Sequence, residues 1–240
     1  MKTEIVWQSH KGMNGKENKD FAGVAVRTDA ILLMVLDGLS SSVNSSSYVR
    51  KIATSLTDWF VSTEESINED VLIRKLRETH SCVCAQFKKE AASYVLAIYR
   101  KRSSLLVLHT GDCLLGFQKT QDISWCIRPH TLANAVEDLA IEQIIASPLR
   151  NRLTQCFKVG EFTVPEVTRI ESLEKQTIIL ATDGFWADFS PQQKNSVLSN
   201  ETELSKYKPQ DDCSILTIKV SHSSAEEIKL RTTGSNIVIK

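Results

Sequence analysis

Five aspartates of this chain lie where an apolar run meets a polar turn, and this placement suits cation chemistry. They are Asp20, Asp37, Asp112, Asp183 and Asp211. Carboxylates that are brought together repel one another, and a cluster of them is tolerated when a cation lies between them. Oxygen ligands favour hard divalent ions such as magnesium and manganese over zinc. For each aspartate taken alone a plain turn stays the alternative, because Asp and Gly commonly end strands.

Two apolar runs each lead into an Asp-Gly pair. Residues 31–36 are all apolar and precede Asp37-Gly38, and residues 177–182 precede Asp183-Gly184. Such runs are too short to span a bilayer and are typical of strands that are buried on both faces. The two strands are therefore expected to deliver their aspartates from the middle of a sheet.

Two patterns predict helices that cover a sheet. Apolar residues within residues 48–60 recur at i, i+3, i+4 and i+7, which indicates an amphipathic helix. A second helix is expected to follow it, with Ser66 and Glu69 as a capping box. The segment Ser190-Pro191-Gln192-Gln193 carries the same kind of start signal for a short helix.

Closely spaced strand patterns in the middle of the chain favour antiparallel hairpins over βαβ units. They cover residues 94–99, 105–110, 114–117 and 123–127. Near the end of the chain, residues 228–231 and 237–239 flank a turn and predict a terminal hairpin. Arg150 and Arg152 follow a helical stretch, and a position on a helix surface is favoured for them over contact with a phosphate.

Composition excludes several classes of partner. Lys plus Arg equals Asp plus Glu, at 29 each in 240 residues, so no overall field attracts nucleic acid or an anionic membrane. The first residues lack an apolar signal core, and no run reaches the ~20 apolar residues of a membrane span. The six cysteines show no paired C-x-x-C spacing, so we expect reduced thiols. The expected location is cytoplasmic, with no membrane and no nucleic acid as partner.

Seven short motifs follow one another along the chain. They are Asn18-Lys19-Asp20, Val35-Leu36-Asp37-Gly38, Thr110-Gly111-Asp112, Pro129-His130-Thr131-Leu132, Asn151-Arg152-Leu153-Thr154, Ala181-Thr182-Asp183-Gly184-Phe185-Trp186 and Asp211-Asp212-Cys213-Ser214-Ile215. Each is weak alone. In order and rough spacing they resemble the motifs of the metal-dependent protein phosphatases of the PP2C type (the PPM family), in a compact, bacterial-like form. The resemblance extends to about Val220.

The resemblance implies an α+β fold, a four-layer α-β-β-α sandwich of two packed antiparallel sheets flanked by helices, with metals in a cleft at one edge. Residues 1–220 would form the phosphatase domain, and residues 221–240 would be a C-terminal extension. By family position His130 would lie in a flap beside the site.

The resemblance also implies a ligand set for manganese or magnesium. Asp37 would bridge two ions, helped by the Gly38 carbonyl. Asp183 and Asp211 would hold the first ion, Asp20 would hold the second mostly through water, and Asp112 matches the position of a third, weaker ion. The implied activity is hydrolysis of phosphoserine or phosphothreonine in proteins. A water activated by the binuclear centre would attack in line, without a covalent enzyme intermediate. The implied partners are a phosphoprotein substrate and a cognate serine/threonine kinase, in signalling.

The chain departs from the family at three places. Gly15 takes the place of the arginine that grips the substrate phosphate, and the adjacent Lys16 would supply a point charge in place of a planar fork. Lys19 takes the place of a frequent glutamate. Leu39-Ser40-Ser41 follows Asp37-Gly38, so a histidine that serves as general acid is absent there. These departures leave a second interpretation open, a PP2C-like module of little or no activity that binds metal or a phosphoprotein.

Overall fold

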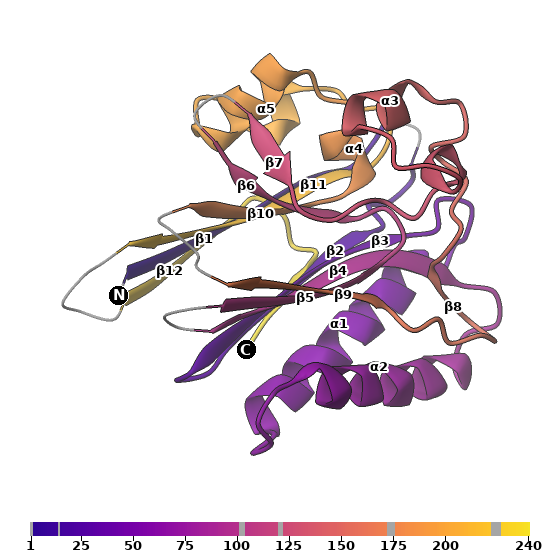
Figure 1. Cartoon of the computed structure of the whole chain (residues 1–240), viewed down its shortest axis with the longest axis vertical. Coiled ribbons are helices and arrows are strands. Elements are labelled where there is room, and N and C mark those ends of the chain that lie inside the picture. Colours follow the sequence, from indigo (N-terminus) through magenta and orange to yellow (C-terminus); the bar gives the residue numbers. More distant parts are fainter. Residues whose placement is uncertain (1, 14, 101–103, 120–121, 172–175, 222–226) are drawn as a thin grey trace.

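Two β-sheets lie face to face between two layers of helices (Figure 1). The computed structural model describes residues 2–13, 15–100, 104–119, 122–171, 176–221 and 227–240. Strands of the first sheet run in the order β12-β1-β11-β10-β6-β7, and those of the second in the order β13-β2-β3-β4-β5-β9, with β8 paired to β4. The predicted α+β sandwich is therefore confirmed.

The strands have the following bounds in chain order. They are β1 (Lys2–His10), β2 (Asp20–Val26), β3 (Ala30–Gly38), β4 (Ala91–Arg100), β5 (Ser104–Thr110), β6 (Leu114–Gln118), β7 (Ile123–Trp125), β8 (Phe157–Lys158), β9 (Glu166–Glu171), β10 (Thr177–Ala181), β11 (Cys213–Ser221), β12 (Glu227–Thr232) and β13 (Ile237–Ile239). As predicted, β4 and β5 pair as an antiparallel hairpin, and so do β6 and β7. The chain changes sheets between β5 and β6.

The helices lie outside the two sheets. They are α1 (Ser45–Ser62), α2 (Glu69–Cys84), α3 (Ile141–Ala146), α4 (Asp183–Trp186) and α5 (Pro191–Leu198), with 3-10 turns at Leu132–Asn134 and Leu204–Lys206. Figure 1 shows α1 and α2 under the sheet of β2 to β5, and α4 and α5 over the sheet of β6, β10 and β11. None of the helices in the described ranges is both long and apolar enough to cross a lipid bilayer.

Local signals determined one helix start and misplaced another. The Ser190 hydroxyl accepts from the Gln193 backbone N–H at 3.3 Å and the Gln193 side chain accepts from the Ser190 N–H at 2.8 Å, so the predicted capping box at α5 is confirmed. The capping box expected from Ser66 and Glu69 was wrong. Asn68 is the N-cap of α2, because its side chain accepts from the Val71 N–H at 3.0 Å and satisfies one of the free helix donors.

The sheets are mixed, whereas purely antiparallel sheets were expected. β12 pairs with β1 in parallel, and β13 pairs with β2 in parallel. The terminal hairpin expected from residues 228–231 and 237–239 was therefore wrong. Backbone bonds at both sides of the turn explain why: the Thr233 N–H donates to the Trp7 carbonyl at 3.0 Å, and the Ala22 N–H donates to the Asn236 carbonyl at 3.0 Å. The last residues thus cross from one sheet to the other.

Side chains of β3 alternate between two apolar layers, which accounts for its unbroken apolar sequence. Ile31, Leu33 and Val35 pack between the sheets, whereas Leu32 and Met34 pack against α1 and α2. β10 divides its side chains in the same way between the intersheet layer and the layer under α4 and α5. Both strands are therefore buried on both faces, as their composition predicted.

We expect the intersheet layer to carry much of the stability. Val35 is fully buried, whereas Val136 is 98% exposed. Val35→Ala should lower the free energy of unfolding by about 2 kcal/mol, because it removes two buried methyl groups and leaves a cavity. Val136→Ala, the same chemical change, should stay within about 0.5 kcal/mol of the wild type. Urea unfolding followed by circular dichroism measures both, and equal values would contradict this description of the core.

Candidate metal centre

Neighbouring strands of the second sheet bring Asp20 and Asp37 together. Asp20 begins β2, Asp37 lies next to the end of β3, and the two residues are directly paired across the antiparallel ladder. Paired residues point to the same face of a sheet, with Cβ atoms about 4.5–5.5 Å apart. The backbone hydrogen bonds of the ladder therefore hold the two carboxylates close.

The crossing between the sheets adds Asp112 to this end. Gly111, which precedes it, has a φ of +90°, and a Cβ there would lie 2.1 Å from the Ser93 hydroxyl. Only glycine fits this left-handed turn against β4. Ser93 pairs with Asp37 across the sheet and donates its hydroxyl to Asp112 Oδ1 at 2.6 Å. The turn thus places Asp112 beside the first two carboxylates.

The first sheet supplies the remaining carboxylates. Asp183 follows β10 and opens α4, and Asp211 precedes β11, the neighbour of β10. The Thr182 hydroxyl donates to Asp20 Oδ2 at 3.0 Å, which joins the two sheets at this point. Asp183 is half-buried, whereas Asp211 is exposed. All five aspartates singled out in the sequence therefore meet at one end of the sandwich.

Burial and mutual repulsion favour the protonated carboxyls at this end. Burial, and then the charge of Asp212, raises the pKa of Asp20 from 3.8 to about 8, against the opposing effect of the Ser214 and Thr182 hydroxyls. The pKa of Asp37 is raised well above its usual value by burial and then by Asp20, Asp183 and Asp112. Burial also raises the pKa of Asp183 and Asp112. A divalent cation would reverse this balance, because it stabilises the ionised forms.

One buried oxygen supports a bound cation directly. Within the described part of the chain, Asp20 Oδ1 is buried and has no hydrogen-bond partner, although the other carboxylate oxygen, Oδ2, accepts from Thr182. A buried carboxylate oxygen without a partner is costly. An ion would satisfy it, and the donor set here consists of oxygen, the ligand that magnesium and manganese prefer. The residues present therefore fit the predicted divalent ions.

Comparison with known proteins identifies the family. Residues 8–215 match the sequence model described as Protein phosphatase 2C. The chain belongs to the protein phosphatase 2C family. Among curated proteins, none has a significantly similar sequence.

Solved bacterial structures share the fold. The S. agalactiae serine/threonine phosphatase is 16% identical in sequence and has a TM-score of 0.77, and the alignment covers 91% of this chain and 100% of that one. Staphylococcus aureus Stp1 is 14% identical with a TM-score of 0.76, over 91% and 95%. The catalytic domain of the serine/threonine protein phosphatase PstP, in complex with two manganese ions, is 14% identical with a TM-score of 0.66, over 92% and 99%.

Family membership confirms three predictions made from the motifs. The chain has the predicted PP2C fold and belongs to the predicted class of enzymes, metal-dependent protein phosphatases. Manganese or magnesium is the corresponding cofactor. The role of each single residue stays a prediction.

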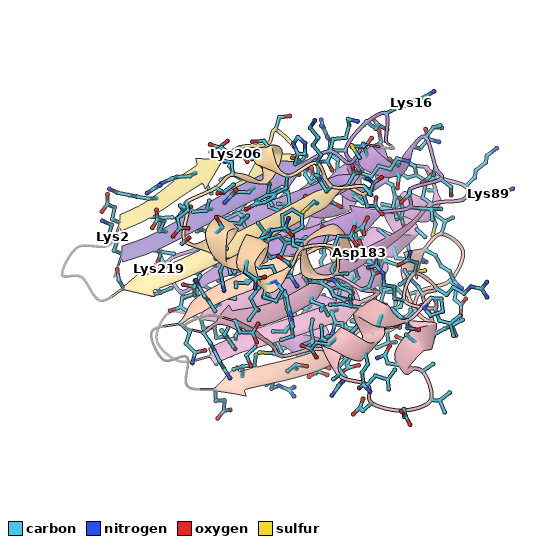
Figure 2. All side chains as sticks on the ribbon, turned by 90° about the horizontal axis from the view of Figure 1, so that it is seen from above. Lys2, Lys16, Lys89, Asp183, Lys206 and Lys219 are labelled. Carbon is cyan, nitrogen blue, oxygen red and sulfur yellow. The ribbon has the colours of Figure 1, made fainter. Side chains whose placement is uncertain are left out.

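The loop between β1 and β2, described at residues 11–13 and 15–19 and called the 11–19 loop below, carries three lysines of this PP2C chain. Lys16 is exposed, and Figure 2 shows its side chain pointing outward, whereas Asp183 lies inside the outline. The Lys11 ammonium donates to the carbonyls of Gly12 at 2.9 Å and Gly15 at 2.5 Å. The Lys19 ammonium donates to the Ser40 carbonyl. The structure therefore does not bring Lys16 to the carboxylates, and its role as a phosphate ligand stays untested.

Asp212 plays a part that its sequence did not reveal. Its Oδ1 accepts from the Gly12 N–H at 2.8 Å and its Oδ2 accepts from the Lys19 N–H at 2.7 Å. Asp212 is buried, and it ties the 11–19 loop to the start of β11. The two N–H groups donate to different oxygens of the carboxylate, and an asparagine would place an NH2 donor opposite one of them. Nothing local in the sequence indicated this long-range contact.

Arg150 was misplaced by the sequence reasoning. α3 ends at Ala146, and Arg150 lies in the turn after it, where its guanidinium pairs with Asp188 at 2.8 Å. The charge of Arg150 opposes the rise in the pKa of both Asp112 and Asp183. Its Nη1 is buried without a hydrogen-bond partner. The expected position on a helix surface was therefore wrong, because the helix stops one turn earlier.

A cluster of His109, His130 and Glu166 lies beside the acidic end, with ligand atoms within 4.8 Å of one another. The Gly111 N–H donates to His130 Nδ1 at 3.2 Å, so the proton of the neutral ring is on Nε2, 3.2 Å from Glu166. The two imidazoles are stacked, with centroids 4.6 Å apart. Ring planes that are nearly parallel and a protonated Nε2 do not suit a shared metal ion. This cluster is accounted for by hydrogen bonding and stacking.

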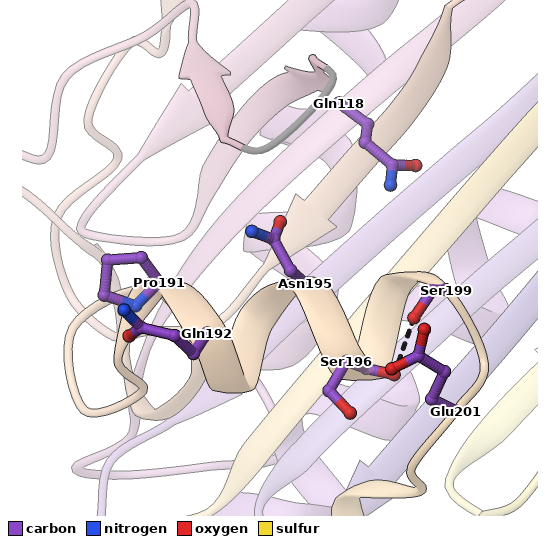
Figure 3. A pocket seen from close by; sticks show the side chains of 7 residues that line it. All are labelled: Gln118, Pro191, Gln192, Asn195, Ser196, Ser199 and Glu201. Carbon is purple, nitrogen blue, oxygen red and sulfur yellow. Dashed lines mark hydrogen bonds between the residues drawn. The ribbon is translucent and has the colours of Figure 1, made fainter.

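Two pockets lie near α5. One is polar and is lined by Gln118, Pro191, Gln192, Asn195, Ser196, Ser199 and Glu201, where the Ser199 hydroxyl donates to the Ser196 carbonyl at 3.3 Å (Figure 3). None of the five clustered aspartates lines it. The other is lined by Arg150, Asp188, Tyr207 and Lys208 among others, and it ends at Gln210, next to Asp211. The second pocket therefore adjoins the acidic end.

The carboxyl cluster predicts how the metal-free protein responds to pH. Because folding raises the pKa of Asp20 from 3.8 to about 8, the folded protein binds more protons than the unfolded chain in that interval. The protonated Asp20 carboxyl therefore stabilises the folded protein fully below pH 3.8, and this contribution is lost as the pH rises through about 8. We expect the Tm of the protein in EDTA to fall by several degrees between pH 5.5 and 8.5. A loss of a few kcal/mol in the free energy of unfolding corresponds to about this change in Tm.

Millimolar manganese should abolish most of this decrease, because ionised carboxylates are the form that binds the ion. Differential scanning calorimetry with and without manganese measures both curves. A Tm in EDTA that rises with pH over this range would contradict the proposed protonation.

Proposed function

We propose that this PP2C-family protein hydrolyses phosphoserine and phosphothreonine in proteins, with its chemistry at the acidic end of the two sheets. One observation carries the proposal. Asp20, Asp37, Asp112 and Asp183 come from four different turns or strand ends, burial raises the pKa of all four, and the charges of the other three raise the pKa of Asp37 further. Such repulsion is costly unless the site serves to hold cations.

The proposed residue roles are those that the family resemblance implies. Asp37 would contribute to both ions together with the Gly38 carbonyl. Asp183 and Asp211, from the first sheet, would hold the first ion, and Asp20 would hold the second. Asp112 would hold a third ion. The central place of Asp37 is supported by its list of charged neighbours, which includes the other four aspartates.

The side chains present favour hydrolysis without a covalent enzyme intermediate. Cys113 and Cys213 are the buried thiols closest to the carboxylates, and burial followed by those charges raises the pKa of each well above its usual value. A protonated thiol is a poor nucleophile. When bound, a pair of divalent cations supplies an activated water and Lewis acidity toward the phosphoryl oxygens. The aspartates position the ions, and this positioning accounts for most of the rate in phosphoryl transfer.

The substrate phosphate needs a cation, since Gly15 replaces the arginine of the family. Lys16 is the candidate on the 11–19 loop, where it is exposed and free to turn. Arg150 is a second candidate, because its Nη1 has no hydrogen-bond partner and its charge acts on Asp112 and Asp183. A guanidinium would offer the phosphate two parallel donors, whereas a lysine offers a point charge.

Several finer expectations belong to the same proposal. We propose that residues 1–220 are the catalytic unit and that residues 221–240 are an extension, of which 222–226 lie outside the described residues. A cytoplasmic location and a role in signalling opposite a serine/threonine kinase remain expectations from the sequence. The free thiols of the described cysteines suit a reducing compartment.

A second function competes with catalysis. The chain would serve as a module that binds metal or a phosphoprotein and hydrolyses little. Gly15 in place of the arginine and Leu39-Ser40 after Gly38 favour this function. The complete carboxylate set favours the enzyme, because a module without turnover has no need for the whole costly cluster.

Asp183→Asn tests the enzyme directly. It removes one charged ligand at nearly constant shape, so we expect kcat/KM for a phosphothreonine peptide at millimolar manganese to fall by roughly 100-fold or more. EDTA should abolish the wild-type activity, and manganese should restore it. Wild-type turnover no higher than that of Asp183→Asn, with both proteins folded by circular dichroism, would favour the binding module.

Gly15→Arg tests the missing phosphate contact. A Cβ at Gly15 would lie 3.2 Å from the Glu17 carbonyl oxygen and 3.6 Å from Asp212 Oδ1, so small shifts accommodate a side chain there. We expect the KM for phosphopeptides to fall about 3- to 10-fold with little change in kcat, because a bidentate contact adds about 1 kcal/mol of binding. Gly15→Gln, of similar length without charge, is the control. An unchanged KM in Gly15→Arg would show that another cation already binds the phosphate.

A further inference from the structure

We propose that Asn236, near the C-terminus, is a positioning residue for Asp20 and thereby for one ion of the metal centre. The inference rests on the proposed function, since it takes Asp20 as a metal ligand. Asn236 lies beyond residues 8–215, the part that matches the family model. The C-terminal segment would thus complete a site whose ligands all lie earlier in the chain.

The side-chain amide of Asn236 has a partner on every polar atom. Its Nδ2 donates to the Asp20 carbonyl at 2.8 Å and to the Ser9 hydroxyl at 2.8 Å. Its Oδ1 accepts from the Trp7 indole N–H at 3.3 Å. Trp7 can only donate, so the oxygen of the amide must face it and the NH2 group must face Asp20. An amide with this orientation fixes the backbone of Asp20 in place.

A line of hydroxyl groups continues from Asn236 toward the Asp20 carboxylate. Ser9 Oγ accepts from Asn236 and also from Asn18 Nδ2 at 2.7 Å, and it lies 2.7 Å from Ser214 Oγ. Since both lone pairs of Ser9 are taken, its own proton goes to Ser214. Ser214 then keeps its proton for its hydrogen bond to the Asp20 carboxylate. Asn236 therefore sets the direction of donation along the whole line.

Backbone contacts hold Asn236 at this place. Its carbonyl accepts from the Ala22 N–H at 3.0 Å, two residues after Asp20, and β13 continues along β2 from there. A Cβ on Gly234 would lie 2.4 Å from Asn236 Oδ1 and 3.2 Å from the Ser9 Cβ. The turn before Asn236 thus packs directly on β1. Figure 1 shows the end of the chain reaching from the first sheet to α1 under the second.

These contacts predict an effect on one ion rather than on the whole site. Without the amide, the Asp20 carbonyl and the Ser9 hydroxyl each lose a donor, and Asp20 gains freedom to turn away. Among the described residues, the Asn236 side chain hydrogen-bonds to Trp7, Ser9 and Asp20 and to neither Asp183 nor Asp211, so the ion that those two would hold should keep its affinity. Residues that orient metal ligands typically contribute 10- to 100-fold in affinity.

The test measures manganese binding to the full chain by isothermal titration calorimetry and by the electron paramagnetic resonance of free Mn2+, without substrate. Asn236→Asp keeps the shape of the side chain and removes both donors, and Asn236→Ala removes the group. We expect each to weaken one class of manganese site by roughly 10-fold or more and to leave a second class unchanged. In steady-state assays the manganese concentration for half-maximal rate should rise by a similar factor, with kcat at saturating manganese within about 2-fold.

Ile237→Ala is the matched control, because it weakens the packing of β13 on the intersheet layer and leaves the amide in place. It should lower the Tm without changing manganese affinity. Wild-type manganese affinity in both Asn236 variants would overturn the inference, and so would an equal loss in Ile237→Ala. Asp20→Asn distinguishes failure of the proposed metal site from failure of the inference about Asn236. If Asp20→Asn binds manganese normally, the proposed role of Asp20 fails. If it binds weakly while the Asn236 variants bind normally, only the inference about Asn236 fails.

Discussion

Repulsion among buried carboxylates governs the architecture of this protein. Burial raises the pKa of Asp20, Asp37, Asp112 and Asp183, and the charges of neighbouring aspartates raise it further. The backbone hydrogen bonds between β2 and β3 keep Asp20 opposite Asp37 despite the repulsion between their charges. Such a site is stable when protons or cations neutralise it, so its chemistry and its stability depend on the same ions.

The two sheets make this concentration of charge possible. Three apolar layers fill the space between the sheets and on their outer faces, and they anchor each strand well away from the acidic end. Each aspartate lies at a strand end or in the turn beside one, where the backbone leaves the apolar layer. A rigid core with charged ends is a general way to hold ligands at fixed places. In this PP2C fold, strands of both sheets bring their aspartates to the same end.

Polar contacts between distant segments complete the site. Asp212 ties the 11–19 loop to β11, Thr182 joins Asp20 to the other sheet, and Asn236 brings the C-terminal segment to Asp20. In each case a hydrogen bond joins two groups that lie more than 100 positions apart in the sequence. The departures from the family lie on the surface around these contacts, in the 11–19 loop and at residues 39–41.

The sequence by itself determined two buried strands, the start of one helix and the family. Unbroken apolar runs identified β3 and β10 as strands buried on both faces, because only such strands need apolar side chains at every position. Seven motifs in order were sufficient for the family and its fold, and the capping box of α5 follows from neighbouring residues alone. These features depend on composition, periodicity and local hydrogen bonds, all of which are visible along the chain.

Only the tertiary structure decided where long-range partners meet. The two C-terminal strands pair in parallel with edge strands of different sheets. Side-chain packing decided these pairings, and the turn between the two strands did not. Asn68 replaced Ser66 as the cap of α2, since several polar residues competed for one helix end. Asp212, Arg150 and Asn236 looked like ordinary polar residues in the sequence, and their roles arise from contacts with Gly12, Asp188 and Asp20. Contacts between residues so far apart leave no pattern in the neighbouring sequence, so only the tertiary structure shows them.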